Sequence, residues 1–263
     1  MTARRIEAAF ARAKGEKRSA LVAYLCAGDP SLAATERLVP AIVSAGADII
    51  ELGVPFSDPI ADGPVIQAAS QRALASGTSL PKLLDLVARL RASGLSAPLV
   101  LMGYANPMVA MGWEQFAQRA ARAGVDGAIV PDLPLEEAEP VSALFDAAGL
   151  DLVLLAAPTT PPERLARIAE RPRGFLYFVS VTGVTGGGAE LPEELPAMLA
   201  RARQVSRVPV AVGFGVSRPE QARLLAPHAD GVVVGTAIVR EIERAGGAAE
   251  PVAAPVRSLR QAL

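Results

Sequence analysis

The residues best suited to acid–base chemistry lie in one acidic segment, Glu-Leu-Gly-Val-Pro-Phe-Ser-Asp-Pro-Ile-Ala-Asp-Gly-Pro, at positions 51–64. Glu51 belongs to a short apolar run, which predicts a carboxylate at the carboxyl end of a β-strand. Its side chain would point either into a pocket or outward toward a helix. In a pocket, partial desolvation would raise the pKa of the carboxyl group toward the neutral range that suits proton transfer.

Two further carboxylates, Asp58 and Asp62, follow in a loop that is stiffened by proline. Each also has an ordinary structural explanation, because Asp58 could form a turn with Pro59 and Asp62 could cap a helix beginning near Pro64. The chain contains one histidine, His228, between a predicted helix and a predicted strand. A proton-transfer enzyme with this sequence must therefore depend on carboxylates or tyrosines.

Three glycine-rich turns, at 183–188, 213–215 and 235–236, follow the last three predicted strands. Glycine lets backbone N–H groups approach an anion closely, and a helix N-terminus adds favourable dipole charge. Any one of these turns could be an ordinary tight loop, but three at consecutive strand ends favour a phosphate ligand. Walker and dinucleotide motifs are missing from the sequence, so we expect binding mainly by backbone amides. The glycines at 186–188 extend a loop that could close over a substrate.

The elements that must position these residues alternate between short apolar runs and segments with helical periodicity. The runs are continuously apolar, which is typical of parallel strands buried on both faces. The predicted strands are 21–26, 48–52, 99–102, 127–130, 152–155, 175–179, 208–212 and 231–234. The predicted helices are 32–45, 65–76, 80–93, 113–123, 135–148, 162–171, 192–204, 219–226 and 237–244.

This alternation predicts an α/β fold, a single-domain (β/α)8 TIM barrel over residues 1–263. A doubly wound open sheet is the alternative, because periodicity alone does not exclude it. The Ala/Gly/Pro-rich end of the chain, from about 246 to 263, is expected to be loose. Active sites of barrels lie at the carboxyl ends of the strands, so Glu51 and the glycine-rich turns would share one face.

Composition restricts the class of ligand. Lys and Arg total 26 and Asp and Glu total 27, with no long basic run, so the sequence does not indicate nucleic-acid binding. Cys26 is the only cysteine, and no internal disulfide is possible. No apolar run approaches the roughly 18 residues that span a bilayer, and the N-terminus lacks the apolar region of a secretory signal. We therefore expect a cytoplasmic protein with a small-molecule ligand and no membrane contact.

Five segments, taken together, resemble the tryptophan synthase alpha subunit family. They are the segment 51–64, Met-Gly-Tyr-Ala-Asn-Pro at 102–107, Pro-Asp-Leu-Pro at 131–134, Ser-Val-Thr-Gly-Val-Thr-Gly at 180–186 and Gly-Phe-Gly-Val at 213–216. The resemblance runs in order from Tyr24 to about Glu243. It implies a lyase of tryptophan biosynthesis that cleaves indole-3-glycerol phosphate to indole and glyceraldehyde 3-phosphate by a retro-aldol reaction.

The resemblance also implies residue roles. Glu51 matches the acid–base that protonates indole C3, Asp62 matches the carboxylate that binds the indole N–H, and Tyr177 matches the tyrosine beside the glutamate. The implied phosphate-binding residues are Gly186, Gly215, Gly235 and Thr236. The implied indole pocket consists of Tyr24, Met102, Tyr104, Ile129 and Phe214. Thr185 matches the closing loop, and the implied partner interface consists of Asp58, Pro59, Asn106 and Pro134.

The partner implied by the resemblance is a tryptophan synthase beta subunit, in an α2β2 heterotetramer. Pyridoxal phosphate would belong to that subunit, and no cofactor or metal is expected on this chain. Three alternatives stay open: a free-standing lyase that releases indole, a non-catalytic sensor of a phosphorylated ligand, and another phosphosugar barrel enzyme. The last is disfavoured because the carboxylate segment lacks a histidine or lysine base.

Overall fold

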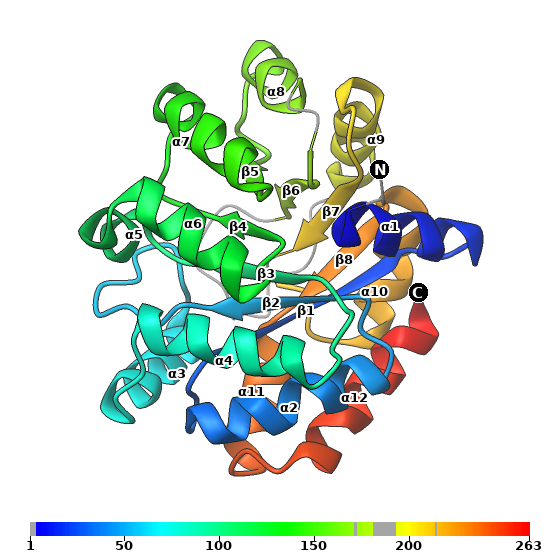
Figure 1. Ribbon diagram of the computed structural model, residues 1–263. Helices are drawn as coiled ribbons and strands as arrows, with labels where there is room; N and C mark the ends of the chain where they lie inside the picture. Colours follow the sequence, from blue (N-terminus) through cyan, green and yellow to red (C-terminus); the bar gives the residue numbers. More distant parts are fainter. Residues whose placement is uncertain (1–3, 171–172, 181–192, 214) are drawn as a thin grey trace.

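Eight parallel strands close into a barrel in sequence order (Figure 1). The computed structural model describes residues 4–170, 173–180, 193–213 and 215–263. The strands are β1 (Ala20–Cys26), β2 (Ile49–Gly53), β3 (Leu99–Met102), β4 (Gly127–Ile129), β5 (Asp151–Ala156), β6 (Leu176–Val179), β7 (Val210–Gly213) and β8 (Gly231–Val234). Because β1 pairs with β8, the sheet has no open edge, and the predicted (β/α)8 barrel is confirmed over the doubly wound alternative.

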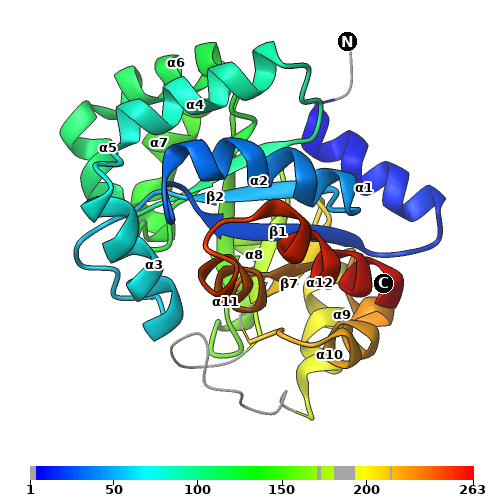
Figure 2. The ribbon, with the colours of Figure 1, turned by 90° about the horizontal axis from the view of Figure 1, so that it is seen from below.

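Helices surround the barrel on its outer side (Figures 1 and 2). They are α1 (Arg5–Gly15), α2 (Leu32–Ser44), α3 (Pro64–Ala75), α4 (Leu80–Ala92), α5 (Ala105–Met111), α6 (Trp113–Ala123), α7 (Leu135–Ala148), α8 (Pro162–Ala169), α9 (Leu195–Val205), α10 (Pro219–Leu225), α11 (Thr236–Arg244) and α12 (Ala249–Ala262). The sequence did not predict α1, α5 or α12. Among the described residues, no helix is long and apolar enough to cross a membrane.

Alternate residues of each strand face two different apolar cores. On β1, Leu21 and Leu25 pack in the outer core between the sheet and the helices. Val22 and Tyr24 belong to the inner core, which fills the barrel. A strand places successive side chains on opposite faces, and in a barrel these two faces are the inside and the outside. Any polar side chain at an inner position therefore enters the centre of the barrel.

Helix α1 closes the amino-terminal end of the barrel. Phe10 of α1 belongs to the inner core, and its ring centroid lies 5.6 Å from that of Phe175, just before β6. Below the barrel, Arg12 of α1 and the neighbouring Arg18 both bind the buried carboxylate of Asp48. At the opposite, carboxyl end, the described residues leave a pocket open.

The chain end was expected to be loose, and the structure corrects this. Residues Ala249–Ala262 form α12, which packs against α2 and α11 (Figure 2). Val252, Val256 and Leu259 recur at helical spacing and are buried. The expectation was wrong because it rested on the Ala/Gly/Pro-rich composition of the tail. The apolar stripe makes packing against the barrel favourable despite Pro255 inside the helix.

Candidate active site

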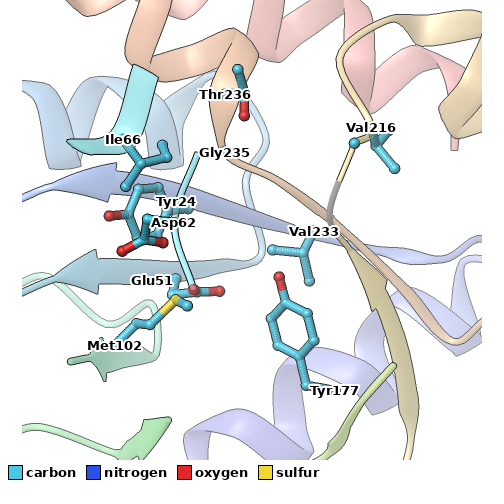
Figure 3. A pocket seen from close by; sticks show the side chains of 11 residues that line it. Tyr24, Glu51, Asp62, Ile66, Met102, Tyr177, Val216, Val233, Gly235 and Thr236 are labelled. Atoms are coloured by element: carbon cyan, nitrogen blue, oxygen red, sulfur yellow. The ribbon is translucent and has the colours of Figure 1, made fainter. Parts of the chain in front are cut away.

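A pocket opens at the carboxyl ends of the strands and holds the predicted carboxylates (Figure 3). Its empty space, counted together with its open mouth, is about 400 Å³. Its lining residues come from β1, β2, β3, β6 and β8, from the loops after β2 and β7, and from the starts of α3 and α11. They are Tyr24, Glu51, Asp62, Ile66, Met102, Tyr177, Gly215, Val216, Val233, Gly235 and Thr236.

Glu51 points into this pocket and not toward a helix. It lies at the third position of β2, beside Tyr24 of β1 in the sheet register, and only 1% of its surface is exposed. Its Oε2 atom is buried, and no described residue hydrogen-bonds to it. Burial raises the pKa of Glu51 to about 8, with a smaller contribution from the charge of Asp62. Glu51 therefore retains its proton near neutral pH and can donate it to a bound molecule.

Asp62 approaches the same pocket from the loop that follows β2. Helix α3 is capped by Gly63, so the alternative role of Asp62 as the capping residue is not observed. Burial raises the pKa of Asp62 to about 6, and a hydrogen bond from the Tyr104 hydroxyl, 2.9 Å from Oδ2, acts in the opposite direction. Near neutral pH the two carboxyl groups thus differ, with Asp62 ionised and Glu51 protonated. Such a pair can supply one acid and one anion.

Two inward tyrosines border the carboxylates, and glycines make room for them. Tyr24 and Tyr177 are both buried, and burial raises the pKa of each well above its ordinary value, so both keep their hydroxyl protons. A Cβ atom at Gly53 would lie 2.3 Å from the Tyr24 hydroxyl oxygen. A Cβ atom at Gly213 would lie 2.4 Å from the Tyr177 hydroxyl oxygen. Only glycine at these strand ends allows the two rings to occupy the barrel mouth.

The other end of the pocket consists of backbone and a helix N-terminus. Gly235 and Thr236 lie where β8 passes into α11, whose first N–H groups have no partner within the helix. Gly215, with φ of +92°, lines the pocket after β7. In Figure 3 Gly235 and Thr236 lie at the opposite end from Glu51 and Met102. No lysine or arginine is among the described residues that line the pocket. This end suits an anion held by amides and a helix dipole.

Comparison with known proteins identifies the family. Residues 10–262 match the family described as tryptophan synthase alpha chain. The chain belongs to this family. It is 51% identical to the tryptophan synthase alpha chain of Geobacter sulfurreducens, over 98% of each chain. It is 52% identical to the corresponding protein of Citrifermentans bemidjiense, over 93% of this chain and 91% of that protein.

Solved structures of the tryptophan synthase family have the same fold. The alpha subunit from Legionella pneumophila superposes with a TM-score of 0.90 at 40% identity, over 99% of this chain and 98% of that chain. A chain of the tryptophan synthase complex from Pyrococcus furiosus superposes with a TM-score of 0.85 at 41% identity, over 91% of this chain and 97% of that chain. This chain therefore shares the barrel fold of these two proteins along nearly its whole length.

The structure brings most of the predicted alpha-chain site residues together, but not all of them. Ile129 is fully buried in the inner core and does not line the pocket. Tyr104 lines a smaller neighbouring cavity that shares Tyr24, Asp62, Ile66 and Met102 with the pocket. Phe214, Thr185 and Gly186 lie outside the described residues. Their assigned roles stay predictions from the resemblance.

Three pocket residues were not identified from the sequence. Ile66 belongs to the first turn of α3, Val216 follows β7, and Val233 lies on β8. All three are apolar and buried, like the many core residues of an alpha-chain barrel. Val233 could have been predicted from its strand position, because it lies two residues before Gly235 and therefore faces the same side of the sheet. For Ile66 and Val216 the sequence carries no comparable signal.

The residues predicted to face a partner lie together on the rim of the barrel. Asp58 belongs to the loop after β2, Asn106 to α5 after β3, and Pro134 to the segment after β4. Since β2, β3 and β4 are neighbours in the sheet, these loops form one continuous part of the rim. Asp58, Asn106 and Pro134 are exposed, and Pro59 is half-buried. Two exposed apolar side chains accompany them, Ile60 at 78% and Val109 at 54%.

Proposed function

We propose that Glu51 and Asp62 of this alpha chain cleave indole-3-glycerol phosphate to indole and glyceraldehyde 3-phosphate. The observation that carries this proposal is a pocket with a carboxyl group of raised pKa at one end and a helix N-terminus at the other. The first suits proton transfer to a carbon of the indole ring, and the second suits a phosphate monoester. The apolar wall formed by Tyr24, Met102 and Ile66 suits the flat indole ring.

In the proposed mechanism Glu51 donates its proton to indole C3, which leaves the ring electron-poor. Asp62, ionised near neutral pH, accepts a hydrogen bond from the indole N–H and stabilises the positive charge that develops there. The resulting Glu51 carboxylate then accepts the proton of the glycerol hydroxyl on the carbon attached to C3. That carbon becomes the aldehyde as the C–C bond breaks, and its bonding electrons return to the ring. No proton or electron is gained or lost overall.

The remaining pocket residues would bind and orient the substrate. Tyr177 lies beside the carboxylates and keeps its hydroxyl proton, so it would contact the reacting part of the substrate. Amides at Gly215, Gly235 and Thr236 would hold the phosphate, together with Gly186 from the resemblance. Thr185 would belong to the loop that closes over the bound substrate, and Phe214 to the wall of the indole slot. This mechanism uses no metal or cofactor on the chain.

We further propose that the chain works with a tryptophan synthase beta subunit in an α2β2 complex. Pyridoxal phosphate would be bound by that subunit, which would consume the indole. Ile60 and Val109 have exposed apolar side chains beside the predicted interface residues, and this supports a docking surface at the rim. A free-standing lyase would have no need of such a surface. A cytoplasmic location is part of the same proposal, since the two subunits would act in one biosynthetic step.

The decisive experiment is indole release from indole-3-glycerol phosphate by the purified chain, with and without a beta subunit. We expect weak release that the beta subunit stimulates, and we expect Glu51→Gln to abolish it. Full activity of the isolated chain would favour the free-standing lyase. Failure of the wild-type chain under both conditions would favour a sensor of a phosphorylated ligand, and unchanged turnover by Glu51→Gln would refute the mechanism.

A further inference from the structure

The hydroxyl group of Tyr104 makes two hydrogen bonds, and both involve the loop that carries Asp62. It accepts a hydrogen bond from the backbone N–H of Ala61 at 3.0 Å, and it donates one to Asp62 Oδ2 at 2.9 Å. A phenol has a single proton. Since the Ala61 N–H already points at the oxygen, the phenol proton is directed at the carboxylate. The arrangement therefore favours an ionised Asp62 with a fixed orientation.

Tyr104 is itself held rigidly. It is 4% exposed, it precedes the first turn of α5, and its ring centroid lies 5.4 Å from that of Phe56 in the loop after β2. The next residue, Ala105, donates its N–H to Asp132 in the loop after β4. The hydroxyl is thus anchored from the loops after β2, β3 and β4. Because the Tyr104 side chain is already fixed, it loses little conformational entropy when it orients a neighbouring carboxylate.

Tyr104 is not among the described residues that line the pocket with Glu51. It lines the small neighbouring cavity, together with Asp62, Phe56 and Pro131. We infer that Tyr104 is a positioning residue, which acts through Asp62 by keeping that carboxylate oriented toward the indole N–H. The inference rests on the proposed lyase function, in which Asp62 must accept that hydrogen bond.

The charges near this pair define the expected pH effect. Among the described residues, the ionisable groups coupled by charge to Asp62 or Tyr104 are Tyr24 and Cys26 from β1, Glu51 from β2, Tyr177 from β6 and Asp132 from the loop after β4. None of them is a cation, and no lysine or arginine is among the described residues lining either cavity. The Tyr104 hydrogen bond is the influence that lowers the pKa of Asp62. Its removal should raise that pKa further.

The test is Tyr104→Phe, which removes only the hydroxyl group. We expect kcat/KM for indole-3-glycerol phosphate to fall on the order of tenfold at pH 6, mostly through kcat, since charged hydrogen bonds have effects of this size. The loss should shrink as the pH rises, because Asp62 then ionises without help. In an Asp62→Asn background the same change should have little further effect, since the two residues act as a unit. A loss of equal size at every pH and in both backgrounds would overturn the inference.

A second readout does not depend on turnover. In protein labelled with ¹³C at aspartate carboxyl groups, the resonance missing from Asp62→Asn identifies Asp62. Its titration midpoint should be higher in Tyr104→Phe than in the wild type, and equal midpoints would refute the role of Tyr104. If the chain proved not to be a lyase, a shifted midpoint would still establish the contact. Replacing Tyr104 by 4-aminophenylalanine, which retains a donor, should restore the midpoint toward the wild-type value even if the phenylalanine variant folds poorly.

Discussion

At the scale of single residues, the pocket separates two carboxyl groups by their surroundings. Glu51 and Asp62 belong to one acidic segment, yet the pKa of Glu51 is raised to about 8 and that of Asp62 to about 6. Glu51 is completely enclosed and its Oε2 atom has no hydrogen-bond partner among the described residues. Asp62 is less desolvated and accepts a hydrogen bond from Tyr104. Because of this difference, Glu51 is the proton donor of the proposed reaction and Asp62 is the anion.

The first prediction follows from these two pKa values. Below about pH 6 Asp62 gains a proton and no longer accepts the indole N–H, and above about pH 8 Glu51 loses the proton that it must donate. We therefore expect a bell-shaped profile of kcat/KM with its maximum between these values, measured from initial rates between pH 5 and 9. Asp62→Asn should remove the acid limb. Asp58→Asn, on the exposed part of the same loop, should leave the profile of the isolated chain unchanged.

The second prediction concerns stability at the same residue. Because the folded-state pKa of Glu51 is raised, the folded chain binds a proton that the unfolded chain loses between about pH 4.5 and 8. Folding stability should therefore decrease over this range, by up to about 1.4 kcal/mol per pH unit from this group alone. Glu51→Gln should unfold at a higher urea concentration than the wild type at pH 8, with a smaller gain at pH 5. A variant that is less stable than the wild type at both pH values would contradict this reasoning.

At the scale of elements, the sequence predicted the strands better than it predicted three of the helices. Parallel strands buried on both faces appear as short apolar runs, and β3 and β8 were predicted with the observed bounds. Helix α5 is short and lies between Tyr104 and Gly112, so its periodicity is weak. Helix α1 begins after Arg4, which provides no side-chain cap, and α12 contains a proline. These helices form because the barrel buries their apolar sides, which a local pattern does not reveal.

The same limit applies to the site. The position of Glu51 near the end of a predicted strand favoured a place at the active face of a barrel. Whether its side chain points into the pocket or toward a helix was left open by the sequence, and the structure shows that it lines the pocket. The hydroxyl of Tyr104 instead depends on how the loop after β2 lies against the start of α5. That contact joins residues 42 positions apart in the chain, and no spacing rule predicts it. Tyr104 was accordingly predicted as a wall residue, whereas the structure shows its bond to Asp62.

The third prediction concerns the attachment of α1 to the barrel. The buried carboxylate of Asp48 binds Arg18 and Arg12 and also accepts the N–H of Leu21, the second residue of β1. Asp48→Asn should lower the free energy of unfolding at neutral pH by about 3 kcal/mol, since a buried pair is broken and Arg18 keeps only the half-exposed carboxylate of Glu16 as an ion-pair partner. The matched control, Asp146→Asn, breaks an exposed pair with Arg173 and should cost less than about 1 kcal/mol.

The sign of the pH dependence at Asp48 provides a further check. Its arginine partners and the Leu21 amide hold the pKa of Asp48 below its ordinary value of 3.8. The stabilisation is therefore fully present above pH 3.8 and is lost as the pH falls through the lower, folded-state pKa. Urea unfolding of the wild type and Asp48→Asn should differ at pH 7 and converge in strong acid. A difference that persists unchanged at low pH would show that charge pairing is not its source.

At the scale of the whole molecule, the two ends of the barrel have different roles. The amino-terminal end is closed by α1, with Phe10 in the inner core and Asp48 beneath the sheet. The carboxyl end holds the pocket and, beside it, the exposed rim after β2, β3 and β4. The loop after β2 contributes to both the pocket and the exposed rim. Asp62 lines the pocket, and Ile60, two residues earlier, is 78% exposed. A partner that bound the rim would therefore contact the loop that positions a carboxylate of the site.

The last prediction tests this rim with a matched pair of exposed apolar residues. Val109 of α5 is 54% exposed, and Leu224 of α10 is 68% exposed. Helices α5 and α10 lie on different sides of the barrel (Figure 1). Val109→Asp should leave the basal cleavage of indole-3-glycerol phosphate unchanged and weaken stimulation by a beta subunit at least about tenfold, since a charge in an apolar interface is costly. Leu224→Asp should alter neither. The measurement is indole release as a function of beta-subunit concentration, and equal half-stimulating concentrations for the two variants would place the partner surface elsewhere on the barrel.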